Sequence, residues 1–163
     1  IMIIISKLED LEKYRDIMPA NKNDGKHKKV VYNFIENDKQ ADVLFDLAID
    51  LTYECQKANK DDYECCVYVK AKSITLNYSF TCNKIFADNL LIKDWCNCDF
   101  ALIHKSIIGN NLKCENIHCL SSIDCQNIYT RQLQCKSIKA KLLNIENKIV
   151  FNDINSNKIE FKL

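Results

Sequence analysis

Hydrophobic and polar positions in the C-terminal half of the chain follow a short unit of five residues. The units beginning at Leu112, Ile123 and Leu133 each place a large aliphatic residue two positions before a cysteine, and other units use Ala or Thr as the small residue. Because residues two apart share one face of a strand, each unit directs two side chains to the same side. The pattern predicts a β-solenoid, a stack of short strands, over residues 69–150.

The spacing of similar units suggests how many strands close one turn. Leu112 and Leu133 begin closely similar segments, and the interval between them matches four units with one inserted residue. Two units would enclose too little space for a core, whereas four units, about twenty residues, would form a square coil with two inward side chains per wall. We therefore expect a four-sided solenoid.

Residues 1–68 have the mixed periodicity of an α/β cap. Met2–Ile5 indicates a buried strand, and the Ser6 to Glu9 capping box predicts a helix that buries Leu8, Leu11, Tyr14 and Ile17 and ends before Pro19. Residues 30–35 indicate a second strand, and residues 39–58 a longer helix. This β-α-β-α order, followed by the solenoid, predicts an α+β protein whose cap covers the open end of the stack.

Residues 151–163 alternate apolar and charged side chains near the end of the segment. This pattern predicts a closing strand or hairpin over the last coil. The expected division is therefore a cap at 1–68, a solenoid at 69–150 and a closing segment at 151–163.

The chain contains 10 cysteines, a number that in a short secreted protein would suggest disulfides. The opening apolar run is only five residues long, which is too short for a signal peptide or a membrane span. We therefore expect reduced thiols, a cytoplasmic protein and no membrane association. Five cysteines occupy the small position of the repeat, which predicts buried structural residues: Cys82, Cys114, Cys119, Cys125 and Cys135.

Charge is distributed unevenly along the chain. Residues 1–68 carry 10 basic and 14 acidic side chains, whereas residues 69–150 carry 11 basic and 6 acidic ones. In the expected helix at 39–58, four carboxylates recur every four residues and would share one face. This strip is interpreted either as a solvated helix face, as a docking surface for a basic protein partner, or as a divalent-metal site without the tight loop of calcium sites; it comprises Asp42, Asp46, Asp50 and Glu54.

Residues 91–110 interrupt the repeat and contain the single tryptophan, Trp95, and a Cys-x-Cys pair. We expect a bulge or loop here, with Trp95 on a partner-binding surface. A zinc site is an open alternative, because zinc takes four soft ligands; its candidates are Cys96, Cys98, His104 and His118, or Cys65 and Cys66 in place of the histidines. The other interpretation needs no cofactor and places one cysteine of the pair inside the coil.

Other kinds of chemistry have weaker support. Lysines near Arg131 form a modest basic patch, but the chain has only two arginines, which argues against direct nucleic-acid binding. No local pattern pairs a nucleophile with a base, so we do not expect an enzyme.

The repeat resembles that of bacterial pentapeptide-repeat proteins, and more narrowly that of short bacterial proteins with Asp-Ile-x-Ala-x runs. The resemblance covers about half of the chain and rests on three segments: Asn116-Ile117-His118-Cys119, Asn127-Ile128-Tyr129-Thr130 and Ser137-Ile138-Lys139-Ala140. The usual pattern places its small residue two positions before the central aliphatic, whereas here it comes two positions after. Some proteins of this kind mimic nucleic acid, which implies an acidic solenoid; this one is basic.

Together these features predict a rigid, non-enzymatic module that binds a protein partner, with a nucleoprotein complex as one candidate, and that exists as a monomer or homodimer. Heavy use of Ile, Lys and Asn is typical of AT-rich genomes, and the chain is small. A phage or mobile-element inhibitor of a host defence complex, such as an anti-CRISPR protein, is the specific hypothesis. A zinc-binding protein and a nucleic-acid mimic are the alternatives.

Overall fold

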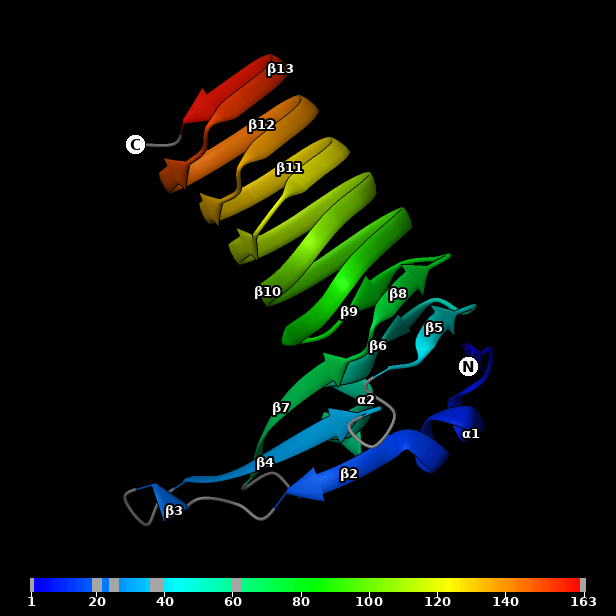
Figure 1. Cartoon of the computed structure of the whole chain (residues 1–163). Helices are drawn as coiled ribbons and strands as arrows, with labels where there is room; N and C mark the ends of the chain where they lie inside the picture. The colour runs from blue at the N-terminus through cyan, green and yellow to red at the C-terminus, as the bar shows by residue number, and fades with distance from the viewer. Residues whose placement is uncertain (1, 19–21, 24–26, 36–39, 60–62, 162–163) are drawn as a thin grey trace.

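Strands dominate the computed structural model, which describes residues 2–18, 22–23, 27–35, 40–59 and 63–161 (Figure 1). About 74% is strand, arranged as a β-solenoid of about 6 turns, and the described residues include only 2 short helices. The β-solenoid predicted from the five-residue unit is therefore confirmed. In Figure 1 the turns from β10 to β13 stack as a rod, and the N-terminal elements lie at the end away from the C terminus.

The regular turns come from strands that begin at residue 63 and pair with their neighbours in parallel. Their bounds are β7 Tyr63–Lys70, β8 Ser73–Leu76, β9 Phe80–Thr81, β10 Lys84–Cys119, β11 Ser122–Gln134, β12 Ser137–Val150 and β13 Asp153–Phe161. With 36 residues, β10 passes through more than one complete turn.

Each regular turn contains three paired segments, which we call walls A, B and C. Wall A comprises residues 73–76, 89–92, 106–109, 122–125, 137–140 and 153–156. Wall B comprises residues 80–81, 96–97, 111–114, 127–130, 142–145 and 158–161. Wall C includes residues 68–70, 84–86, 116–118, 132–134 and 148–150. Phe100, from the turn between residues 84–86 and 116–118, lies beside Phe86 with ring centroids 5.9 Å apart.

The expected four-sided coil is not confirmed. Leu112 pairs with Ile128 on the next turn, and the chain closes that turn before it reaches Leu133, which pairs with Ile117. Leu112 and Leu133 therefore belong to different walls, B and C. Because every unit presents the same aliphatic and small positions, unit spacing does not record how many units close a turn.

Each wall directs one column of mainly aliphatic side chains into the tube. Burying such a side chain contributes about 1.5–3 kcal/mol, so these columns supply most of the core. The column of wall A is Ile74, Leu90, Ile107, Ile123 and Ile138; that of wall B is Phe80, Cys96, Leu112, Ile128 and Leu143; that of wall C includes Val69, Ile85, Ile117 and Leu133, all buried.

Small residues of the repeat fill many of the remaining inward positions, and large ones such as Leu76, Ile92 and Ile145 fill others. The five cysteines expected at small positions are buried and free. Cys114 lies beside Thr130, and Cys125 lies between Gly109 and Ala140 of the neighbouring turns. Only glycine fits at position 109, because a Cβ there would clash with the carbonyl oxygen of Ile92 on the neighbouring turn.

The N-terminal elements extend the same three walls. Their bounds are β1 Met2–Ile5, α1 Leu8–Leu11, the 3-10 turn η1 Glu12–Tyr14, β2 Arg15–Met18, β3 Lys22–Asn23, β4 His27–Phe34, β5 Asp42–Phe45, β6 Ile49–Asp50 and α2 Leu51–Lys57. Strands β1 and β5 continue wall A in front of β8, β6 pairs with β9 of wall B, and β4 pairs with β7 of wall C. The β-α-β-α cap is therefore not confirmed.

The predicted long helix at 39–58 is wrong over most of its length. Residues 42–45 form β5, which pairs on both sides with β1 and β8, and helix α2 begins only at Leu51. Val43 and Phe45 point inward, whereas Leu44 is half-buried on the outer face. The segment satisfies both a helical stripe and a strand alternation, and pairing with two neighbouring strands favours the strand.

The predicted helix after Ser6 is also shorter than expected. Four residues form α1, and Ile17 lies exposed in β2, which pairs antiparallel with β4. Asp10, rather than Glu9, closes the helix start, because its carboxylate accepts a hydrogen bond from the Ser6 backbone nitrogen at 3.0 Å. Pairing of residues 15–18 with a long central strand outweighs continuation of the helix.

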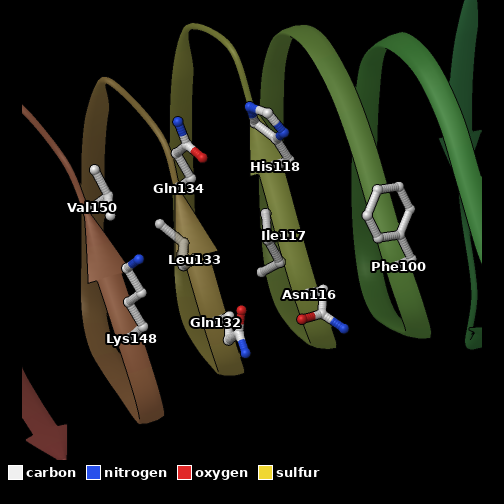
Figure 2. Close-up of a pocket in the computed structure, with 9 residues that line it drawn as sticks. All are labelled: Phe100, Asn116, Ile117, His118, Gln132, Leu133, Gln134, Lys148 and Val150. Atoms are coloured by element: carbon white, nitrogen blue, oxygen red, sulfur yellow. The ribbon is translucent and has the colours of Figure 1, made fainter.

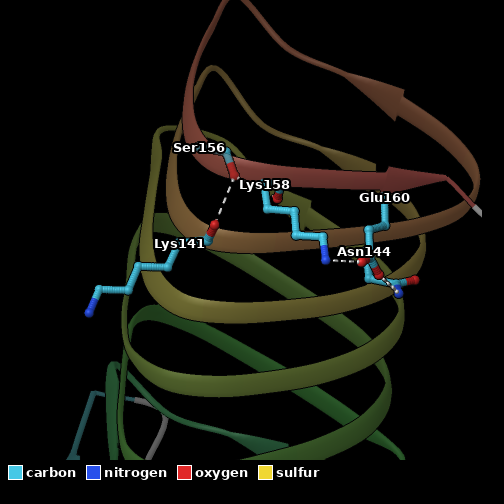
Figure 3. A network of polar contacts seen from close by, with 5 residues as sticks. All are labelled: Lys141, Asn144, Ser156, Lys158 and Glu160. Carbon is cyan, nitrogen blue, oxygen red and sulfur yellow. Dashed lines mark hydrogen bonds and ion pairs between the residues drawn. The ribbon is translucent and has the colours of Figure 1, made fainter.

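The C-terminal segment forms a further turn of the stack, since β13 pairs in parallel with β12 (Figure 3). Across these two turns Ser156 Oγ donates to the Lys141 carbonyl at 3.4 Å, and Asn144 Nδ2 donates to Glu160 at 3.1 Å. Glu160 also pairs with Lys158 at 2.8 Å. The proposed division of the chain after residues 68 and 150 stays a prediction.

Candidate protein-docking edge

Side-chain hydrogen bonds between turns organise the edge of the solenoid where wall A passes into wall B. Asn77 Nδ2 donates to the Asp46 carboxylate at 2.9 Å, and Ser79 Oγ donates to Asp94 at 3.4 Å. Asp50 lies at the start of α2 and accepts a hydrogen bond from the Tyr53 backbone nitrogen at 3.0 Å. Three exposed carboxylates are thereby held in defined positions.

Exposed aromatic side chains stand beside these carboxylates. Tyr78, between Asn77 and Ser79, is 50% exposed, and Tyr53 on α2 is 58% exposed. Trp95 follows Asp94 directly and lies half-buried against Tyr129, with ring centroids 5.9 Å apart. We call this set the docking edge: Asp46, Asp50, Tyr53, Tyr78, Asp94 and Trp95.

Trp95 lies at a local irregularity of β10. Cys98 and Cys114, which belong to neighbouring turns, hydrogen-bond inside the tube. If the same sequence spacing held for Asp94, its neighbour on the next turn would be Asn110. Instead, Asn111 Nδ2 donates to the Asp94 carbonyl. One extra residue is therefore accommodated between Asp94 and Cys98. A loop over residues 91–110 is not formed, because all of these residues remain within β10.

The four carboxylates predicted as one helical strip are separated. Asp42 lies on the outer face of β5 and accepts a hydrogen bond from Ser73 Oγ at 2.7 Å, and Glu54 on α2 pairs with Lys57 at 3.1 Å. Asp46 and Asp50 lie on the docking edge with Trp95. The premise of a shared helix face is wrong, because residues 42–50 are not helical.

Sequence reasoning does not single out Tyr53, Tyr78 or Asp94. The triplet Asn77-Tyr78-Ser79 separates two inward positions, Leu76 and Phe80, and such a polar interruption marks the end of one wall. A tyrosine in that interruption must point outward. The position of Tyr78 can therefore be inferred once the walls are assigned.

The candidate zinc ligands are not brought together. Cys96 and Cys98 are both buried inside the tube, whereas His104 is exposed with its Nδ1 3.4 Å from Asp88, and His118 is an outward residue of wall C. A hydrogen bond with Cys114 lowers the pKa of the Cys98 thiol, but a hydrogen bond with Cys96 and burial together outweigh it and raise that pKa well above its usual value. Among the residues that the structure describes, no group of three or more His, Cys, Asp or Glu side chains forms a metal site.

Wall C carries a shallow hollow of about 390 Å³ (Figure 2). Phe100 stands at one end and Lys148 with Val150 at the other, and Figure 2 shows the amide side chains of Asn116, Gln132 and Gln134 together with His118. This lining offers hydrogen-bond donors and acceptors but no carboxylate.

Fold and site together define a β-solenoid protein with three-segment turns and an acidic, aromatic edge. Comparison of the chain with protein-family models, with curated proteins and with solved structures found no match. The resemblance to pentapeptide-repeat proteins stays a prediction. Neither helix in the described part of the chain has the length and hydropathy needed to cross a membrane.

Proposed function

We propose that this chain is a non-enzymatic interaction module that binds a protein partner through the docking edge. The supporting observation is the combination of exposed tyrosines with carboxylates that hydrogen bonds hold in place. Aromatic side chains dominate the binding energy of many protein interfaces. Tyr53 and Tyr78 provide such anchors, and neighbouring carboxylates favour a partner with a basic surface.

The solenoid makes this edge rigid before binding. Asp46 and Asp94 each accept a hydrogen bond from a residue of the loop between β8 and β9. The two strands that flank this loop are each paired with a neighbouring strand on both sides. A preorganised surface loses less conformational entropy when a partner docks. A larger part of the contact energy of these side chains therefore contributes to the binding affinity.

A narrower form of the proposal concerns the partner. Small size and the residue usage of an AT-rich genome suit a phage or mobile-element inhibitor that binds a host defence complex, as anti-CRISPR proteins do. Nucleic-acid channels of such complexes are basic. An acidic edge would contact the protein component of that nucleoprotein complex, with no direct contact to nucleic acid.

The test compares variants that remove charge while preserving hydrogen bonds. Asp46→Asn, Asp50→Asn and Asp94→Asn in one chain keep an accepting oxygen at each position, and asparagine is also a good helix cap. The matched control changes three exposed acids of the regular turns, Asp124→Asn, Glu146→Gln and Asp153→Asn.

Both chains and the unaltered protein are immobilised and exposed to nuclease-treated lysate of a low-GC bacterium, and captured proteins are quantified by mass spectrometry. We expect a stoichiometric partner on the unaltered protein and the control, and at least tenfold less on the docking-edge variant. Tyr53→Ala with Tyr78→Ala should reduce capture similarly. Equal capture by all chains, or no stoichiometric partner, would overturn the proposal.

A further inference from the structure

Two cysteines of successive turns, Cys119 and Cys135, lie where wall C passes into wall A. The preceding residues of the two strands, His118 and Gln134, are paired in register. The Cys119 and Cys135 thiols hydrogen-bond to each other. Carbonyl oxygens of Ser122 and Ser121 lie 3.3 Å from the Cys119 and Cys135 sulfurs respectively, so both thiols are held at this corner.

Both residues line one surface hollow of about 240 Å³, although they are only 1% and 3% exposed. His118, Lys136 and Phe151 also line it. One water occupies about 30 Å³, so the hollow admits a molecule as small as hydrogen peroxide. The hollow can therefore bring a small oxidant to the corner that holds these two residues.

The spacing of the two strands suits a disulfide. Neighbouring strands lie about 4.8 Å apart, and disulfides join residues whose Cα atoms are about 4.4–6.8 Å apart. A bond between Cys119 and Cys135 therefore needs rotation of the two side chains and little movement of the backbone.

The local environment also activates one thiol. Hydrogen bonding with Cys135 is the largest influence on the Cys119 thiol and lowers its pKa to about 7, against burial, which raises it. The same contact raises the pKa of Cys135. Because the thiolate is the nucleophile, Cys119 is the attacking sulfur and Cys135 the resolving one.

We propose that Cys119 and Cys135 form a redox-active dithiol that reacts with hydroperoxides and closes to a disulfide between turns. The Cys119 thiolate attacks one peroxide oxygen; an S–O bond forms, the O–O bond breaks, and the second oxygen leaves as water or alcohol after taking a proton from solvent. The Cys135 sulfur then attacks Cys119; the S–S bond forms, the S–O bond breaks, and hydroxide leaves as water with the Cys135 proton. Two thiols are oxidised by two electrons, and one hydroperoxide is reduced.

Cys98 and Cys114 provide an internal comparison within the same chain. They also hydrogen-bond across neighbouring turns, but burial raises the pKa of Cys114 well above its usual value. Cys98 and Cys114 are 3% and 1% exposed, as little as Cys135 and Cys119, so the two pairs differ in the pKa of their thiols rather than in burial. This pair should therefore stay reduced at peroxide doses that oxidise Cys119.

The experiment treats the folded full chain with hydrogen peroxide, blocks free thiols by alkylation, and maps peptides without reduction. Cleavage after Glu115, before Asp124, after Arg131 and after Lys136 isolates Cys119 in residues 116–123 and Cys135 in residues 132–136. We expect these two peptides to be linked, with a loss of two hydrogens, and to separate on reduction.

Two conservative variants assign the roles. Cys119→Ser should abolish the link, whereas Cys135→Ser should leave a sulfenic acid on residue 119 that dimedone traps. Serine is compatible with this interior, since Thr130 and Ser156 occupy other small positions of the repeat. A link that forms equally between Cys98 and Cys114, or that forms only after unfolding, would overturn the proposal. So would the absence of both link and dimedone adduct in the unaltered, folded chain.

Discussion

The first turns and the later turns of this molecule share three walls but use very different lengths of chain. Along wall A, Met2 pairs with Asp42 and Asp42 with Ser73, so several other elements lie between successive strands of this wall. From Ser73 onward the rungs follow closely, as in Ser73 with Asn89 and Ser122 with Ser137. The extra chain of the first turns forms α1, β2, β3 and α2, whereas β4 continues wall C by pairing with β7.

This difference separates the requirements of the interior from those of the surface. Both regions fill the tube with the same kinds of side chain, such as Val43 and Phe45 in β5 and Ile123 and Cys125 in β11. Extra elements between two strands of a wall are therefore tolerated wherever the chain returns to that wall in register. The docking edge lies at the junction, because Asp46 and Asp50 come from the first turns and Asp94 from the regular ones.

Truncation of the shared interior should have the largest effect. Leu112→Ala, in the column of wall B, and Leu51→Ala, in α2, each remove a fully buried side chain. Each should lower the free energy of unfolding by about 2–5 kcal/mol, measured by urea denaturation. Leu91→Ala is the matched control, because Leu91 lies on the outer face of β10 and is 37% exposed; its effect should stay within about 0.5 kcal/mol. Equal effects at Leu112 and Leu91 would contradict the wall assignment.

Gly109→Ala should have the next largest effect and concerns only the regular turns. The added Cβ would meet the Ile92 backbone oxygen, so two turns must move apart, at a cost of about 1–3 kcal/mol. Because the nearest atom is backbone, Ile92→Val should not restore stability in the double variant. Restoration, seen as a recovered urea midpoint, would show that the side chain rather than the backbone sets the spacing.

The five-residue unit is readable from sequence because it follows directly from strand geometry. Ile117 and Cys119 are two apart, share a face and are buried as expected. The number of units that close one turn cannot be predicted from the sequence, since Leu112 and Leu133 have the same local pattern on different walls. The number of walls depends on the backbone angle at each corner, which a side-chain pattern does not encode.

The first turns are harder to predict because their segments carry two periodicities at once. Residues 41–45 suit either a helix stripe or a strand, and only the partners Met2–Ile5 and Ser73–Leu76 decide between them. The docking edge is predictable only in part for the same reason. Trp95 can be selected from the sequence as a surface candidate because of its size. Tyr78 and Asp94 can be selected only after neighbouring turns have been aligned.

Loss of the helix cap in the first turns should have a smaller effect. Asp50→Ala removes the acceptor for the Tyr53 backbone nitrogen and should cost about 1 kcal/mol, measured by urea denaturation. Asp50→Asn keeps an acceptor and should be nearly neutral. Equal destabilisation by the two variants would indicate that charge rather than capping stabilises α2, and would weaken the use of Asp50→Asn as a pure charge change.

The smallest expected effect is a difference in reactivity between two buried thiols of the regular turns. Cys119 has a pKa lowered to about 7, so its thiolate forms as pH rises through that value, and its alkylation rate should reach a plateau by about pH 8. Burial raises the pKa of Cys125 to about 12, so its rate should keep rising with pH over the same range.

Iodoacetamide labelling of the folded chain across neutral pH, quantified on the separate peptides that contain each cysteine, measures both curves. His118 and Lys136 line the hollow beside Cys119, and Lys136→Gln tests whether the lysine contributes to its reactivity. Because Cys125 lacks a partner thiol of the kind that Cys135 provides, it reports how a buried thiol of this tube behaves without that hydrogen bond. Parallel curves for Cys119 and Cys125 would show that the thiol pair gives Cys119 no special reactivity.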